Sequence, residues 1–441
     1  MPDGRDCKRD WVLAIARQSP TTKLMTNTLN KQTNLDIVVL TNSPGELSAL
    51  ARPAIEALAQ TLTNARIILV LTPCQYASGK EIEYANTIPG IARIVGPKEY
   101  QRWFFFNQRP AGLTFNPKGI VVFLGGDLLH AAIVSRKLRY PAVAYVNDRL
   151  GWKKYFKKFF IPDELTYQKF KKKGLGEHQV KIIGDLMASP IPIPTSPASI
   201  AQKNNLDPAQ KIVAFLPGSR TFQLNFMVPF FMDVVDLLVA NQGGMQFVFS
   251  VSPFTEISDM QKLLKSGARL VTERGLTFIV TALGNRILVT KDANYETISL
   301  ADLCITIPGT NTAQLAALGK PMVMVFPLNR PDEIPMEGLM HFITRIPFLG
   351  RQIKKAAARW VNAQTPFFAL PNIKAQQEIV PELRGILKPV QVAQKIIEIL
   401  QSPPKLKIIS EKLVNIMGEK NAAQNLAFEI KSISEGNPIT K

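Results

Sequence analysis

The sequence is short of cysteine and of acidic residues, and it has no long uninterrupted apolar run. Its three cysteines, Cys7, Cys74 and Cys304, are far apart and fit no metal-ligand spacing, so reduced thiols in a cytoplasmic protein are the simplest account. No apolar stretch approaches the roughly 18 residues that span a bilayer, and no secretory signal opens the chain. These absences argue against a disulfide scaffold, a membrane-spanning chain and export by the usual signal.

The composition is that of a globular protein with a strongly basic balance. Apolar residues make up 46% and charged residues 20% of 441 residues, a length that predicts two domains. Subtracting 34 acidic from 53 basic residues gives a net charge of +19. Such a charge favours association with a polyanion, either a nucleic acid or an anionic lipid surface.

The basic residues are concentrated beside aromatic ones. Residues 149–173 contain nine lysines or arginines against two acids, and a second aromatic group lies at 103–106. Lysines beside bulky rings suit a lipid headgroup interface, whereas a basic face over an aromatic core is the structural alternative. No nucleic-acid-binding motif accompanies them, so no nucleic acid is expected among the partners. The predicted membrane surface consists of Trp103, Phe104, Phe105, Trp152, Lys153, Lys154, Lys157 and Lys158.

The first half of the chain predicts strands that alternate with helices. Residues 1–33 form a loose extension in which Met25 is an alternative start, and residues 36–40 form the first strand. A turn at Ser43-Pro44-Gly45 leads into a helix over residues 46–60. Further strands are predicted at 66–71, 91–95, 120–124, 142–146 and 180–183, with a helix at 128–138. Asp127 precedes that helix, so it either caps the helix or points into a crevice.

A proline-rich segment divides the chain near its middle. Residues 187–200 contain four prolines and three serines, a density that resists both helix and strand. The predicted organisation is therefore a loose extension (1–33), an N-terminal domain (34–186), a linker (187–204), a C-terminal domain (205–386) and C-terminal helices (387–441).

After the linker the alternation begins again. A strand at 212–216 is followed by the turn Pro217-Gly218-Ser219-Arg220, a helix at 222–241 and a strand at 246–251. Further elements are predicted at 258–265 (helix), 286–289 (strand), 334–360 (a basic, amphipathic, mostly helical run) and 388–432 (helices). The Pro-Gly-Ser-Arg turn combines backbone N–H groups with a guanidinium, a pairing that suits a diphosphate.

The clearest single unit is residues 301–325. It reads as a strand at 303–307, a turn capped by Thr310 or Asn311, a helix at 312–318 and a second strand from Met322. The first N–H groups of such a helix lie at the carboxyl edge of an open α/β sheet, where a phosphate binds. Two doubly wound α/β domains, a Pro-rich linker and a helical tail together outline a GT-B glycosyltransferase.

Several motifs resemble those of the lipid-A-disaccharide synthase family, whose members transfer a diacylated glucosamine from UDP to a lipid-linked glucosamine 1-phosphate. In the second half these are FLPGSR (215–220), IPGTNTAQLAALGKPMVMVF (307–326) and FALPNIKAQQEIVPEL (368–383). In the first half they are SPGE (43–46), VFLGGD (122–127) and IGDLMASPI (183–191). The resemblance covers roughly residues 36–400 in order.

The resemblance implies a GT-B fold and a UDP-sugar-dependent hexosyltransferase of lipid A biosynthesis without cofactor or metal. It also implies a lipid-linked acceptor, peripheral association with the cytoplasmic face of an anionic membrane, and self-association into a homodimer. Asp127 becomes the candidate general base, and Ser43, Pro44, Gly45 and Glu46 form the acceptor loop. The UDP-sugar is assigned to Gly218, Ser219, Arg220, Gly309, Thr310, Asn311, Gln314, Asn372 and Glu378.

Departures from the family pattern keep alternatives open. Gln314 replaces a glutamate suited to the ribose hydroxyls, Pro44 and Glu46 alter the first loop, and residues 144–156 differ almost entirely. Most of these changes lie in the acceptor half. The alternatives are therefore transfer to another lipid or glycan, such as the peptidoglycan lipid precursor, and a non-catalytic scaffold that binds a nucleotide sugar or a membrane. A UDP-sugar 2-epimerase shares the outline, but the sequence has no His-rich or paired-carboxylate signature for one.

Overall fold

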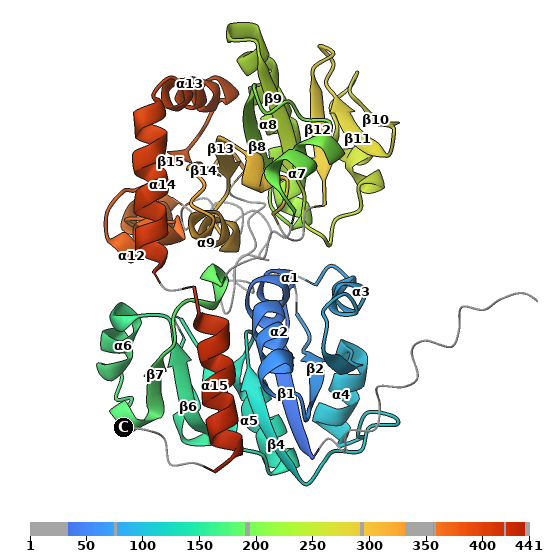
Figure 1. Cartoon of the computed structure of the whole chain (residues 1–441), viewed down its shortest axis with the longest axis vertical. Coiled ribbons are helices and arrows are strands. Elements are labelled where there is room, and N and C mark those ends of the chain that lie inside the picture. Colours follow the sequence, from blue (N-terminus) through green and yellow to red (C-terminus); the bar gives the residue numbers. More distant parts are fainter. Residues whose placement is uncertain are drawn as a thin grey trace, which may run out of the picture.

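The computed structural model describes two α/β domains stacked along the long axis of the molecule (Figure 1). The predicted extension at 1–33 and nearly all of the predicted run at 334–360 lie outside the described residues. The structure describes residues 34–74, 77–147, 149–189, 195–291, 295–330, 356, 359–418 and 420–436.

The first domain is built on a seven-stranded sheet in which every pairing is parallel. Its order is β3-β2-β1-β4-β5-β6-β7, with β1 near the middle and buried along almost its whole length. Strands this apolar are expected where helices cover both faces of a parallel sheet. The strands are β1 Leu35–Thr41, β2 Ala65–Leu71, β3 Ile91–Val95, β4 Lys118–Phe123, β5 Ala142–Tyr145, β6 Phe156–Ile161 and β7 Val180–Ile182.

Helices pack on this sheet from two distant parts of the chain. Most follow their strands, and the predicted helix at 46–60 is a short α-turn, a π-helix (η1) and α2 in succession. The last helix, α15 (Ala422–Ser434), returns from the second domain and packs beside α2 (Figure 1). The other helices are α1 Pro44–Glu46, η1 Leu47–Ala51, α2 Arg52–Thr61, α3 Glu81–Ala85, α4 Pro97–Phe106, α5 Leu128–Leu138, η2 Lys153–Tyr155, α6 Glu164–Lys171, η3 Glu177–Gln179 and η4 Leu186–Ala188.

Strand β6 was not among the predicted elements. It lies inside the basic and aromatic run, and its phenylalanines Phe156, Phe159 and Phe160 are buried in the sheet. Lys158 is also buried, and it forms an ion pair with Glu429 of α15 at 3.7 Å. Much of this run is therefore core, which corrects the expectation of a continuous surface patch.

The second domain has an eight-stranded sheet of order β10-β11-β12-β9-β8-β13-β14-β15. Its β10 and β11 form an antiparallel hairpin that the sequence did not predict, joined by Arg274 and Gly275, both at positive φ. The remaining pairings, apart from β11 with β12, are parallel. The strands are β8 Lys211–Leu216, β9 Met245–Ser250, β10 Arg269–Glu273, β11 Leu276–Val280, β12 Arg286–Thr290, β13 Leu303–Thr306, β14 Met322–Pro327 and β15 Glu382–Gly385.

The long helix α8 forms much of the core of this domain. By length and hydropathy alone α8 is the one helix of the described residues that could cross a membrane, and half of its most apolar window is buried inside the protein. It packs against α13 and the sheet. The helices of this part are α7 Pro197–Lys203, α8 Thr221–Asn241, η5 Ser258–Leu263, η6 Ile298–Leu300, α9 Thr310–Ala317, α12 Leu370–Ala375, α13 Pro389–Leu400 and α14 Pro403–Met417.

The two domains meet through specific contacts as well as through the connections of the chain. The Tyr84 ring lies 4.7 Å from the Phe254 ring, and Lys80 forms an ion pair with Glu256. Within the first domain, Asn425 of α15 donates a hydrogen bond of 3.0 Å to the Ile183 carbonyl, which fixes α15 to the segment that leads into the linker. These contacts hold the carboxyl edges of the two sheets facing one another.

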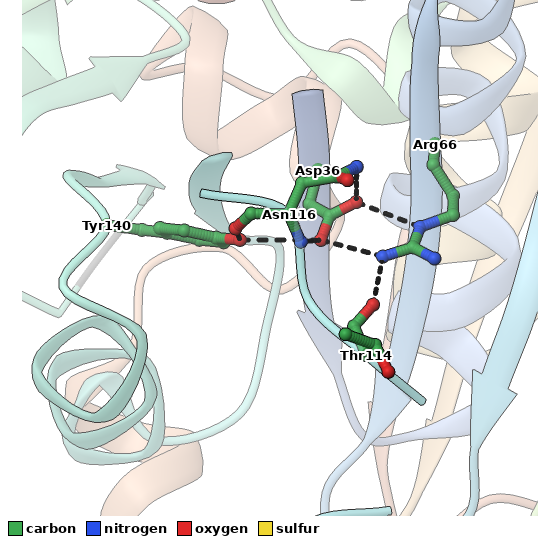
Figure 2. A network of polar contacts seen from close by, with 5 residues as sticks. All are labelled: Asp36, Arg66, Thr114, Asn116 and Tyr140. Atoms are coloured by element: carbon green, nitrogen blue, oxygen red, sulfur yellow. Dashed lines mark hydrogen bonds and ion pairs between the residues drawn. The ribbon is translucent and has the colours of Figure 1, made fainter. Parts of the chain in front are cut away.

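A polar network closes the opposite, amino edge of the first sheet (Figure 2). The Asp36 carboxylate is fully buried and accepts hydrogen bonds from the Arg66 guanidinium (both 2.9 Å), from the Asn116 backbone and side chain (2.7 and 2.8 Å) and from the Tyr140 hydroxyl (3.3 Å). Arg66 also donates to the Thr114 carbonyl. A buried carboxylate is costly unless it is paired and hydrogen-bonded, which accounts for its several partners. Since these partners lie on β2 and on the segment before β4, the network links both to β1.

Candidate functional site

A cavity of about 340 Å³ lies between the carboxyl edges of the two sheets. We call it the interdomain cavity. The loops that line it follow β1 in the first domain and β8, β9 and β13 in the second. From the predicted site residues it contains Ser43, Pro44, Gly45, Glu46, Gly218, Ser219, Arg220, Gly309, Thr310, Asn311 and Gln314. The structure therefore brings the predicted acceptor loop and most of the predicted UDP residues to one place.

The first turn of α9 forms one wall of this cavity. The helix begins at Thr310, and its N-cap is Gly309 at φ +146°, a residue with no side chain to cap the helix. Since Thr310 and Asn311 line the cavity, the positive end of the helix dipole is directed there. The prediction that Thr310 or Asn311 is the N-cap is wrong, because the N-cap lies one or two residues earlier, at Gly309. The predicted position of the helix start beside a ligand site agrees with this geometry.

The Pro-Gly-Ser-Arg turn is organised differently from its prediction. The backbone N–H groups of Ser219 and Arg220 donate to the Gln223 side-chain oxygen at 3.2 and 3.1 Å. A Cβ on Gly218 would lie 2.6 Å from that oxygen, and Gly218 has φ +103°, so this position requires glycine. In this conformation Gln223 occupies N–H groups that were expected to bind a diphosphate, and the exposed Arg220 side chain remains as the cation of this turn.

Tyr295 is a site residue that the sequence did not reveal. It is buried at the cavity wall, where its hydroxyl lies 2.6 Å from the Gln314 side-chain oxygen and 2.9 Å from the Asn311 side-chain oxygen. Gln314 is itself only 8% exposed. The Tyr295 hydroxyl has one proton, so it donates to one of these two amide oxygens at a time. The loop before β13 that contains Tyr295 has no motif that predicts a site residue. Ser252 and Pro253 also line the cavity, and their position after the end of β9 could have predicted this.

Asn372 and Glu378 do not lie in the interdomain cavity. Asn372 is fully buried: its side chain donates to Val380 O and Glu382 and accepts from the N–H groups of Ile379 and Val380. It thereby locks the turn after α12, and Glu378 is exposed on that turn. Because the hydrogen bonds of Asn372 are satisfied internally, its expected contact with UDP is not supported in this structure.

A second cavity, of about 740 Å³, adjoins the first and lies mostly within the first domain. We call it the first-domain cavity. Asp127 lines it, but this exposed carboxylate also caps α5 by accepting a 2.8 Å hydrogen bond from Leu129 N. Asp127 thus both caps α5 and faces a cavity, the two alternatives that the sequence left open. Asn42 and Asn147 line the same cavity, and each has a buried side-chain oxygen without a hydrogen-bond partner among the described residues. Such oxygens suit ligand hydroxyl or N–H donors.

Glu46 lies where the two cavities join. Its carboxylate accepts hydrogen bonds from the Ser43 hydroxyl at 3.1 Å and from Gly126 N at 3.4 Å. Burial raises the pKa of Glu46 above its ordinary value of 4.5, although these hydrogen bonds and the positive charge of Arg149 act in the opposite direction. A half-buried carboxyl with a raised pKa in a cleft is typical of functional sites.

The predicted membrane-surface residues do not form one surface. Trp103 is buried and stacks on Phe115, Lys158 is buried, and Lys153 donates to the carbonyls of Lys173 and Gly174. Phe104 is half-buried. The clearly exposed members are Phe105 (70% exposed), Trp152 (47% exposed), Lys154 and Lys157. Phe106, which was not among the predicted residues, is also exposed (73%). The buried members were misassigned because α4 and β6 each have an inward face.

The arrangement can bind an anion and can accept a proton. Arg220 and the start of α9 supply positive potential on one side of the interdomain cavity, and Glu46 supplies a carboxylate on the other. Among the described residues, no group of three or more histidine, cysteine, aspartate or glutamate side chains is placed to hold a metal ion.

Comparison with known proteins finds a matching family model and relatives of low identity. The protein-family model described as lipid-A-disaccharide synthetase matches residues 156–402. A lipid-A-disaccharide synthase of Paraburkholderia phymatum is 24% identical over 57% of this chain and 56% of its own. Lipid-A-disaccharide synthase 2 of Legionella pneumophila is 22% identical over 86% of this chain and 87% of its own. The chain thus aligns with about half of the first relative and with most of the second.

Solved structures share the architecture at low identity. The S. aureus MnaA–UDP co-structure has a TM-score of 0.56 and 10% identity, covering 91% of this chain and 97% of that one. The calicheamicin glycosyltransferase CalG4 has a TM-score of 0.50 and 12% identity, covering 92% and 99%. These likenesses concern the fold alone. The fold is GT-B, two Rossmann-like domains with a cleft between them, as predicted.

Proposed function

The chain belongs to the lipid-A-disaccharide synthetase family, and from that premise we propose that it is an inverting hexosyltransferase that moves a sugar from a UDP-sugar to a lipid-linked acceptor. The specific version is the joining of two acylated glucosamines in lipid A biosynthesis.

One observation carries the proposal: two motifs that resemble the family's UDP-binding residues meet in one cavity. Gly218–Arg220 and Gly309–Asn311 come from separate βα units, yet they line the same 340 Å³ space. Arg220 and the start of α9 would hold the diphosphate and stabilise its charge as it leaves. Gln314, oriented by Tyr295, would face the ribose hydroxyls as a neutral partner. The MnaA structure, which has the same fold, is a co-structure with UDP.

The acceptor side of the proposal rests on the first-domain cavity. This cavity joins the interdomain cavity at Ser43, Glu46 and Arg220, so an acceptor there would reach the donor sugar. Its rim includes the exposed Trp152, while Phe105 and Phe106 project from the end of α4. Association of these rings with the cytoplasmic face of an anionic membrane, and a homodimer in solution, belong to the same proposal.

The experiment that tests the donor site is calorimetric titration of UDP and a panel of UDP-sugars, with Arg220→Ala as the comparison. Loss of a charge-assisted hydrogen bond costs about 1.5–3 kcal/mol, so the dissociation constant should rise about 10-fold to 100-fold. Arg286→Ala, at an exposed ion pair on the far side of the same domain, is the matched control and should bind UDP normally. Wild-type protein that binds no uridine nucleotide would leave the non-catalytic scaffold as the better hypothesis.

Co-sedimentation with vesicles tests the membrane surface. Lys154→Glu together with Lys157→Glu should reduce binding to anionic vesicles, since both side chains are exposed. Binding that these changes leave intact would assign the two lysines to an ordinary solvated face.

A further inference from the structure

Three side chains line both cavities: Ser43, Glu46 and Arg220. Arg220 is a cation that suits the leaving diphosphate, and a serine hydroxyl does not accept a proton near neutral pH. We propose that Glu46, and not Asp127, is the group that takes the proton from the acceptor hydroxyl. The inference rests on the proposed function. In the step itself, the acceptor oxygen bonds to the anomeric carbon as the bond from that carbon to the UDP oxygen breaks; the proton passes to Glu46, and the bonding electron pair leaves with UDP.

The local fold holds the Glu46 carboxylate at this junction. Ser43 is the N-cap of α1: its hydroxyl accepts from Glu46 N at 3.3 Å and lies 3.1 Å from the Glu46 carboxylate. On the opposite side the carboxylate packs against the turn after β4. A Cβ on Gly125 would lie 2.6 Å from the Glu46 carboxyl carbon, and both Gly125 and Gly126 have positive φ. The two glycines therefore leave room for the carboxylate, and Gly126 N donates to it.

The environment of Glu46 suits a general base. Its pKa lies above the ordinary 4.5 because burial disfavours the charged carboxylate, which brings it closer to neutral pH. Among the described residues, the charged groups that line the first-domain cavity with it come from three elements: Arg149 after β5, Arg220 after β8, and Asp127 before α5. The positive charge of Arg149 lowers the pKa of Glu46 and so acts against the effect of burial.

Asp127 is less well placed for this task. It lines only the first-domain cavity, it is exposed, and one of its oxygens is used to cap α5. One oxygen of Asp127 is thus held by the backbone of α5, and the side chain does not line the interdomain cavity. Asp127 therefore holds the start of α5 and forms part of the wall against which an acceptor would lie.

The test compares Glu46→Gln with Asp127→Asn in a transfer assay. The probe is UDP-linked diacylglucosamine as donor and diacylated glucosamine 1-phosphate as acceptor, with kcat measured from acidic to alkaline pH. The wild-type kcat should fall at acidic pH as Glu46 becomes protonated. Glu46→Gln should lower kcat by about 100-fold or more, with little change in the donor KM, and should remove this acidic decline. Asp127→Asn should keep the decline at the same pH.

Two further measurements keep the assignment falsifiable. Ser43→Ala removes a hydrogen bond that stabilises the Glu46 carboxylate, so the acidic decline should move to higher pH. Glu46→Gln removes a buried charge, so its Tm at neutral pH should exceed the wild-type Tm, and this difference should vanish below the ordinary pKa of 4.5.

Several results would overturn the inference. These are a Glu46→Gln variant with normal kcat and an unchanged acidic decline, an Asp127→Asn variant that alone loses the decline, or a Glu46→Gln variant no more stable than wild type at neutral pH. Wild-type protein that binds UDP but transfers to no acceptor would instead contradict the proposed function, and the Tm comparison would still report on Glu46.

Discussion

Two carboxylates lie at opposite ends of strand β1, and they differ in burial and in their hydrogen-bond partners. Asp36 at the amino end is fully buried, and its oxygens accept hydrogen bonds from Arg66, Asn116 and Tyr140 (Figure 2). Glu46, beyond the carboxyl end, accepts from Ser43 and Gly126 and faces two cavities. The amino edge uses its polar groups to hold strands together. The carboxyl edge leaves polar groups available for a ligand, as in other open α/β sheets.

The largest effect should come from the amino edge. Asp36→Ala leaves Arg66 and the Asn116 amide without their partner, so the free energy of unfolding should fall by about 3 kcal/mol. UDP affinity of the folded fraction should not change. Urea denaturation with calorimetry measures both quantities. Glu273→Ala, which breaks an exposed ion pair with Arg286, is the control and should cost at most about 1 kcal/mol. A loss of UDP binding in folded Asp36→Ala would contradict the division between the two edges.

An intermediate effect is expected at the start of α8. Gln223→Ala removes a cap, which costs about 1 kcal/mol of stability, and releases the N–H groups of Ser219 and Arg220 for a diphosphate. UDP should therefore bind up to about fivefold more tightly, a gain of about 1 kcal/mol. Calorimetric titration and urea denaturation are the measurements.

The chain offers a matched control for this change. Gln391 makes the same contact with Lys388 N at the start of α13, so Gln391→Ala should lose similar stability while UDP affinity stays constant. Weaker UDP binding by Gln223→Ala would mean that the Gln223 amide itself holds the nucleotide, contrary to the cap interpretation.

The smallest effect should come from Tyr295→Phe. Removing the hydroxyl leaves the Gln314 and Asn311 amides free to turn, which should weaken UDP binding about threefold and cost about 1 kcal/mol of stability. Tyr140→Phe removes a buried hydroxyl from the amino edge of the first sheet and is the control: it should lower stability and leave UDP affinity unchanged. Equal UDP affinities for both variants would remove Tyr295 from the site.

The sequence was informative where apolar strands end at glycine-containing turns. The units that begin at β1, β8 and β13 were predicted because a short apolar run, a turn and a helix follow in order. These units also carry most of the residues that the structure gathers in the interdomain cavity. Fold and candidate site were therefore predicted together, since in a doubly wound sheet the turns after the strands line the cleft.

The failures have physical causes that lie elsewhere in the chain. Strand β6 was missed because Lys157 and Lys158 interrupt its apolar pattern, and Lys158 is tolerated inside only because Glu429 of a distant helix lies beside it. The β10–β11 hairpin turns at Arg274-Gly275, which is not a strong turn signal. Tyr295 was missed because its position at the cavity wall depends on the tertiary structure.

The return of α15 to the first domain has a consequence for biosynthesis. Leu426, Ala427 and Ile430 of this helix are buried in the core that also contains Leu58 of α2. One of the helices that cover the first sheet is therefore formed by residues 422–434, near the end of the chain. Domains usually fold in the order in which the ribosome produces them. Here the first domain is synthesised early but cannot complete its core until residues 422–434 have emerged. The first sheet therefore gains this helix only after the whole second domain has been synthesised.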